Sequence, residues 1–196
     1  MKHFILVVSF WLVVQGAMAF QGPVQDSLNV ANKKEIRHTL SLNYGMGFIT
    51  SKVYDEYARR QYSWRHGKDL HAEYRFVIGR NMGLGLMWNY SYTDFKTTGI
   101  DLTYIAPEFI MQGERKHWLF SMTAGIGYAK YDDGIKNDTG FGMHYSVGAE
   151  YLITRHIGVG TDLLVVNTNF GKSDSEYYAA DVINRLSLLI GLRFHL

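Results

Sequence analysis

Six ionisable side chains alternate with apolar residues, and they are the residues of this sequence best suited to chemistry. They comprise three acids and three bases: Glu73, Arg75, Glu150, Asp162, Arg185 and Arg193. His71 and His144 have the same position in the alternation as the nearby Glu73 and Glu150, so they belong to the same polar rows. Charged groups that leave water must be paired and hydrogen-bonded, because unpaired burial is costly. The pattern therefore predicts an interior network of salt bridges that acts as a structural plug. A gate or a proton-conducting path is the second interpretation.

Glycines recur in pairs separated by one residue. The pairs are Gly45/Gly47, Gly83/Gly85, Gly125/Gly127 and Gly158/Gly160. A phosphate-binding loop needs a glycine turn that opens a helix, and none of these pairs precedes a helical pattern. Nucleotide binding is therefore excluded, and we expect the glycines to relieve crowding on the same rows as the charges.

The segment 50–67 is rich in aromatic and basic side chains. They are Tyr54, Tyr57, Arg59, Arg60, Tyr62, Trp64 and Arg65. One interpretation is an adhesive patch or a patch that contacts lipopolysaccharide. The other is an interfacial aromatic belt with a solvated loop. The eight histidines show no metal-ligand spacing and the chain has no cysteine, so we expect neither a metal nor a cofactor.

The elements that must position these residues are β-strands, and the last segment shows this best. In 184–196, apolar residues from Leu186 to Leu196 alternate with Arg185, Ser187, Arg193 and others. Successive side chains of a strand point to opposite faces, so this strand has one apolar face and one polar face. An unpaired edge strand invites aggregation. We therefore expect the last strand to pair with the first and close a barrel.

Alternation predicts eight strands in all. Their ranges are 38–49, 68–78, 82–92, 100–111, 118–128, 140–152, 157–166 and 184–196. In the fourth strand the alternation slips near Pro107, which predicts a bulge. The connections after the second, fourth and sixth strands are short, and the others are longer. This segregation is typical of an outer-membrane barrel.

The N-terminus has the features of a secretory signal. Lys2 and His3 precede the apolar run 4–14, and Ala17-Met18-Ala19 supplies small residues for cleavage after Ala19. The run is shorter than the roughly 20 residues of a membrane-spanning helix. We expect a cleaved signal peptide at 1–19, a polar tail at 20–36 and a barrel at 37–196.

The two faces of the strands favour a membrane barrel over a soluble one. None of the ten lysines lies in the middle of a predicted strand. A Lys or Arg facing lipid at the bilayer midplane would cost roughly 2–4 kcal/mol. We therefore expect the apolar rows to face lipid and the glycines and charges to face inward.

The near-neutral net charge, with scattered Lys and Arg, excludes a nucleic-acid footprint.

These hairpins, G-x-G pairs and the closing strand resemble the small eight-stranded outer-membrane barrels of the OmpA and OmpX type, the "outer membrane protein beta-barrel domain" class. The resemblance covers roughly 37–196. Such chains usually end in an aromatic residue that the barrel-insertion machinery reads, whereas Phe194 is followed here by His195 and Leu196.

A second, shorter resemblance concerns His144-Tyr145-Ser146. It is similar to the H-x-S motif of the lipid A 3-O-deacylases, where His and Ser act with a Glu, a role for which Glu150 or Asp162 would be available. Two departures count against it. Val147 stands where that family has Asn, and this His and Ser share the inward row, whereas the family's pair faces lipid.

The sequence thus predicts an all-β protein, an eight-stranded antiparallel up-and-down transmembrane β-barrel preceded by a cleaved signal peptide. We expect a non-enzymatic monomer in the outer membrane of a Gram-negative bacterium, with both termini periplasmic, acting in envelope structure or surface interaction. A lipid A-modifying enzyme (His144, Ser146, Glu150) and an adhesin acting through its loops are the alternatives. The expected partners are outer-membrane lipids, lipopolysaccharide and, during biogenesis, the barrel-insertion machinery.

Overall fold

The computed structural model describes residues 38–51, 53–55, 60–62, 65–78, 81–94, 99–134, 137–171 and 182–196. The predicted signal peptide and polar tail lie outside the described residues. In the described part, no helix is long and apolar enough to cross a membrane.

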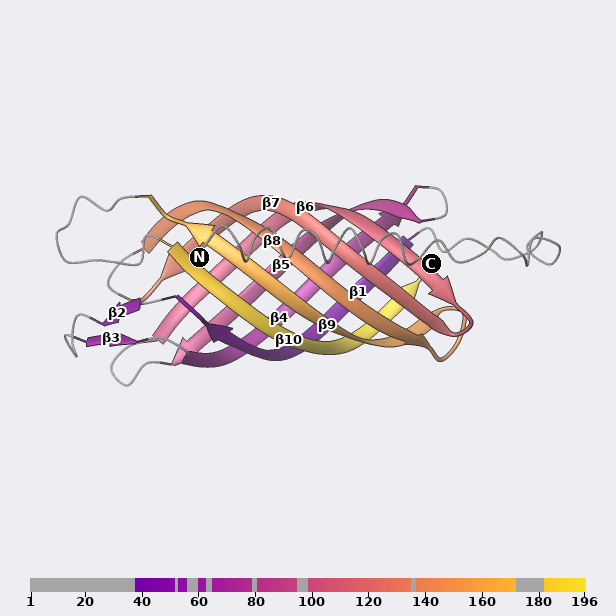
Figure 1. Ribbon diagram of the computed structural model, residues 1–196, viewed down its shortest axis with the longest axis horizontal. Coiled ribbons are helices and arrows are strands. Elements are labelled where there is room, and N and C mark those ends of the chain that lie inside the picture. Colours follow the sequence, from indigo (N-terminus) through magenta and orange to yellow (C-terminus); the bar gives the residue numbers. More distant parts are fainter. Residues whose placement is uncertain are drawn as a thin grey trace, which may run out of the picture. The chain divides into compact units, whose positions relative to one another are not determined.

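Eight of the ten strands form one closed antiparallel barrel, in the order β1-β10-β9-β8-β7-β6-β5-β4 (Figure 1). The barrel strands are β1 (His38–Ile49), β4 (Arg65–Val77), β5 (Met82–Asp94), β6 (Gly99–Arg115), β7 (Trp118–Asp132), β8 (Asn137–Leu152), β9 (Ile157–Asn169) and β10 (Val182–His195). The short strands β2 (Val53–Asp55) and β3 (Arg60–Tyr62) pair with each other in a separate sheet. The predicted all-β barrel is therefore confirmed.

The closing seam joins the two ends of the barrel sequence. β1 pairs with β4 on one side and with β10 on the other. Leu40 lies opposite Phe194, and Phe48 lies opposite Leu186. Every barrel strand thus has two hydrogen-bonded neighbours, so the sheet has no free edge.

The two ends of the barrel differ in their connections. We call the end with the connections 78–81, 116–117 and 153–156 the turn end. We call the end with the connections 50–64, 95–98, 133–136 and 170–181 the loop end. This segregation follows the prediction, although several strands run further than alternation indicated. β6, for example, extends to Arg115 and β7 to Asp132, because their hairpin pairing continues beyond the apolar stretch.

The predicted bulge at Pro107 is wrong. Ile105 pairs with Tyr128 and Glu108 pairs with Gly125, so both strands advance by the same number of residues between these pairs. Burial also alternates without a break: Ala106 and Glu108 are buried, and Pro107 is exposed. The apparent slip arises because the inward row of β6 is itself largely apolar, from Ile100 to Ile110.

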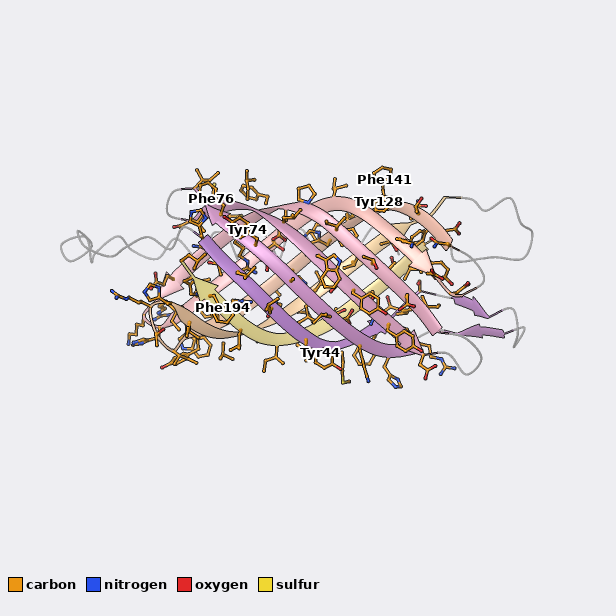
Figure 2. All side chains as sticks on the ribbon, turned by 180° about the vertical axis from the view of Figure 1, so that it is seen from behind. Tyr44, Tyr74, Phe76, Tyr128, Phe141 and Phe194 are labelled. Carbon is orange, nitrogen blue, oxygen red and sulfur yellow. The ribbon has the colours of Figure 1, made fainter. Side chains whose placement is uncertain are left out.

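The orientation of the two faces is as predicted. On the outside, Trp88 is 36% and Leu188 is 59% exposed, whereas on the inside Arg75 is 2% and Glu150 is 0% exposed. The labelled aromatic side chains lie on the outer surface in Figure 2, with Tyr74, Phe76 and Phe194 toward one end and Tyr128 and Phe141 toward the other. An apolar belt with aromatic residues near both ends suits a bilayer and its two interfaces.

Leu188→Arg tests this orientation, since Leu188 lies midway along β10 on the outer face. We expect folding into phospholipid vesicles to lose about 2–4 kcal/mol, because the guanidinium would face hydrocarbon. Equilibrium unfolding in urea measures the loss. Asn169→Arg, at the loop end of β9, is the control and should cost roughly 0–1 kcal/mol. Equal costs for the two variants would contradict the membrane orientation.

Candidate functional site

The candidate site is the barrel interior, where the inward rows of all eight strands meet. Three arginines are buried there. Arg75 lies on β4, and Arg185 and Arg193 lie near the two ends of β10. Each one lies against a carboxylate. The six charges predicted from the sequence fall into three separate clusters.

The turn-end cluster surrounds Arg193 of β10. Its Nη2 donates to both carboxylate oxygens of Asp162 at 2.6 Å, and its Nη1 donates to Glu150 Oε2 at 3.2 Å. The other oxygen of Glu150 lies 2.5 Å from Nε2 of His195, whose Nδ1 lies 3.0 Å from Thr39 Oγ1. This cluster joins β1, β8, β9 and β10, so it bridges the closing seam.

The central cluster contains the carboxyl groups of Glu73 on β4 and Glu108 on β6. Arg75 donates through Nε and Nη2 to the two oxygens of Glu73, the second bond being 2.6 Å long. His71 Nε2 lies 3.6 Å from the same carboxylate. His144 Nε2 lies 3.0 Å from Glu108 Oε2, and its Nδ1 lies 3.2 Å from the Tyr104 hydroxyl.

The loop-end cluster is a bidentate pair between Arg185 and Asp69. Nε and Nη2 donate to the two carboxylate oxygens at 2.9 and 3.0 Å, and Nη1 donates to Thr93 Oγ1 at 2.7 Å. The planar guanidinium matches the carboxylate in this geometry, so the charge of Arg185 is neutralised and most of its donors are used.

An apolar core fills much of the remaining interior. It includes the inward side chains of Ile49, Leu102, Val166 and Ile183, which are all at most 4% exposed, and Phe170 packs against it. Most of its members lie on the loop-end halves of their strands. The lumen of an eight-stranded barrel is just wide enough for side chains to fill it, which agrees with this packing.

Glycines make room for the ion pairs. A Cβ added at Gly160 would lie 2.7 Å from the guanidinium carbon of Arg193, and one at Gly47 would meet the Asp69 and Arg185 side chains. The predicted role of these glycines is thus visible at two positions: the large charged side chains occupy the space in which a neighbouring side chain would stand.

Sequence reasoning missed several interior groups. Asp69, Glu108 and His195 all take part in the clusters, so among the described residues the three clusters contain five carboxyl groups rather than the three predicted. Asp69 and His195 lie on the inward parity of their strands and could have been found from alternation. Glu108 was hidden by the assumed slip at Pro107, which left its face undetermined.

The structure places His144 and Ser146 inside the barrel, at 0% and 8% exposure. Ser146 Oγ lies 2.8 Å from Thr123 Oγ1, and His144 contacts Glu108 and Tyr104. Glu150 belongs to the turn-end cluster with Arg193 and His195. The deacylase-like interpretation required His144 and Ser146 to face lipid, so its geometric condition is not met.

The predicted loop patch is described only in part. Tyr57, Arg59 and Trp64 lie outside the described residues. Tyr54 stands in β2, while Arg60 and Tyr62 stand in β3, and Arg65 is the first residue of β4. In the described part of the chain, no group of three or more His, Asp or Glu side chains could hold a metal ion.

A closed antiparallel barrel with an apolar exterior and an ion-paired lumen defines a small integral membrane β-barrel. The chain belongs to the family described as "Outer membrane protein beta-barrel domain", which matches residues 14–194. This family assigns it to the bacterial outer membrane.

Solved structures with the same fold support the assignment. Neisserial surface protein A is 14% identical with a TM-score of 0.54, over 81% of this chain and 97% of that one. The outer membrane protein OprG from Pseudomonas aeruginosa is 10% identical with a TM-score of 0.52, over 83% and 97%. The N-terminal β-barrel domain of Pseudomonas aeruginosa OprF is 9% identical with a TM-score of 0.51, over 84% and 100%. At these identities the likeness concerns the fold alone. A comparison with curated proteins found no match.

A double-mutant cycle on Arg193 and Asp162 tests the turn-end cluster. Arg193→Met should cost about 3–5 kcal/mol of unfolding free energy, because it leaves two buried carboxylates without their cation. Combining it with Asp162→Leu should cost less than the sum of the two single changes. Urea unfolding in vesicles measures each value.

The control for this cycle is Lys130→Met, which removes an exposed charge and should change stability by no more than about 0.5 kcal/mol. If the costs of the two buried changes simply add, Arg193 and Asp162 are not coupled.

Proposed function

We propose that this protein is a non-enzymatic outer-membrane protein with a plugged interior, acting in envelope structure or surface interaction. The observation that carries this proposal is the filling of the lumen. Its three buried arginines are held by carboxylates, and an apolar core packs toward the loop end. With its interior occupied in this way, the barrel offers partners its outer surface and its loops.

The proposed orientation places both chain ends and the turn end in the periplasm and the loop end outside the cell. Short turns on the periplasmic side and longer loops on the extracellular side are usual in outer-membrane barrels. In this orientation lipopolysaccharide surrounds the loop-end half of the barrel. The barrel-insertion machinery then meets the protein from the periplasm during biogenesis.

The long connection 50–64 supports a second candidate, an adhesin that acts through its loops. Within it, β2 and β3 form a short hairpin in which Val53 pairs with Tyr62 and Asp55 with Arg60. This hairpin gives the connection a regular backbone, and Tyr54, Arg60 and Tyr62 are among its residues. An ordered hairpin loses less conformational entropy on binding than a flexible loop.

Replacement of residues 52–63 by a short Gly-Ser linker tests the adhesin candidate. The replacement keeps the pairing of Ile49 with Arg65, so the barrel should remain intact. We expect binding to cells or matrix to be lost, while heat-modifiable migration of the folded barrel is kept. Shortening the other long connection, at 172–179, is the matched control. Unchanged binding after the 52–63 replacement would reject the adhesin role.

The absence of enzymatic activity is tested by mass analysis of lipid A from cells that express the protein. Because His144 and Ser146 are bonded to interior groups, we expect the same lipid A masses with the wild-type chain, with Ser146→Ala and with an empty vector. Loss of an acyl chain that requires both His144 and Ser146 would overturn the proposal in favour of a deacylase.

A further inference from the structure

Two neighbouring turns at the turn end expose basic side chains. Arg115 ends β6, Lys116 and His117 form the β6–β7 turn, and Arg155 lies in the β8–β9 turn. All four residues are exposed, and we call them the turn-end basic patch. Lys116 adopts a positive φ of 58°, which gives the tight reversal between β6 and β7.

Backbone contacts hold the two turns together. The Leu152 amide at the end of β8 donates to the His117 carbonyl at 2.8 Å. In the next turn, Thr154 Oγ1 accepts from the amides of His156 and Ile157 at 3.2 and 3.0 Å. These bonds fix the backbone on both sides of Arg155, so the turns that bear the basic patch have a defined backbone conformation.

Aromatic rings border the patch on the outer face of the barrel. The rings of Trp118 and Tyr151 meet edge to face with centroids 5.2 Å apart, and the rings of His117 and Tyr151 are 6.0 Å apart. Trp118 is 47% and Tyr151 is 45% exposed. Trp and Tyr at a barrel end lie at the level of the lipid headgroups, which places the basic patch beside the phosphate layer.

The charges of the patch are available for a ligand. In the part of the chain that the structure describes, no ion pair joins Arg115, Lys116 or Arg155 to a carboxylate. Glu114 is the one acid in the sequence of the two turns and the adjoining end of β6, residues 112–117 and 153–156. Three of the loop-end connections, by contrast, contain both acids and bases in the sequence: 50–64, 133–136 and 170–181.

We propose that the turn-end basic patch binds the phosphate headgroup of an anionic glycerophospholipid. Arg115 and Arg155 donate to the phosphate oxygens, and Trp118 and Tyr151 contact the glycerol and upper acyl chain. This inference rests on the proposed orientation, in which the turn end meets the periplasmic leaflet. A lipid fits better than free phosphate, because the charges and the exposed rings together match a headgroup attached to an apolar chain.

Electron spin resonance of spin-labelled lipids tests the proposal in reconstituted membranes. The wild-type barrel should associate with phosphatidylglycerol more strongly than with phosphatidylcholine. Arg115→Gln combined with Arg155→Gln should lower that preference about threefold or more, because it removes two headgroup cations. The matched control, Lys68→Gln combined with Lys130→Gln, removes two exposed charges at the loop end and should leave the preference unchanged.

Two results would overturn the proposal: equal association of the wild type with both lipids, or an equal loss in the loop-end control. Competition by inorganic phosphate beyond the effect of sodium chloride at the same ionic strength would show a free-anion site instead of a lipid site. Sedimentation with peptidoglycan that depends on Arg155, without lipid preference, would assign the patch to a polymer. Heat-modifiable migration confirms a folded barrel in each case, so failure of this proposal is distinguishable from failure of membrane insertion.

Discussion

The hydrogen bonding of the backbone is the constraint on which the rest of this structure depends. Hydrocarbon offers no partner to an N–H or C=O group, so a sheet in a bilayer must satisfy all of them internally. The pairing of β1 with β10 achieves this by removing the last free edge. Closure with eight strands also sets the width of the lumen, and the width decides what the interior can hold.

A narrow lumen makes each buried charge depend on its neighbours. Arg193 is held by residues from β8 and β9, while Arg185 on the same strand is held by Asp69 of β4. Arg185 therefore ties β10 across the closing seam to β4, while Arg193 ties β10 to β8 and β9 on its own side. Glycines such as Gly160 leave the space that these side chains occupy. The ion pairs, the glycines and the apolar core together fill the lumen.

Because side chains fill the lumen, the features that could contact partners lie on the outer surface, and they differ between the loop end and the turn end. The long connection 50–64 with its β2–β3 hairpin belongs to the loop end, whereas exposed arginines and aromatic rings gather on the turns between β6 and β9. An apolar belt separates the two ends. Each end is thus suited to a different surrounding, and the family membership places the belt in the bacterial outer membrane.

Alternation in the sequence by itself determined the eight barrel strands, the face of almost every residue in them and the closure by the last segment, because the period of a strand is two and lipid tolerates few exceptions on its face. It did not indicate the short strands β2 and β3. It failed at Pro107, where an apolar inward row resembled a change of face and concealed Glu108. Only the tertiary structure decided which charges meet. Partners such as Arg185 and Asp69 are far apart in the sequence, and the register and curvature of the closed sheet bring them together. The tertiary structure likewise decided the bonding partners of His144 and Ser146, whose inward face alternation had already predicted.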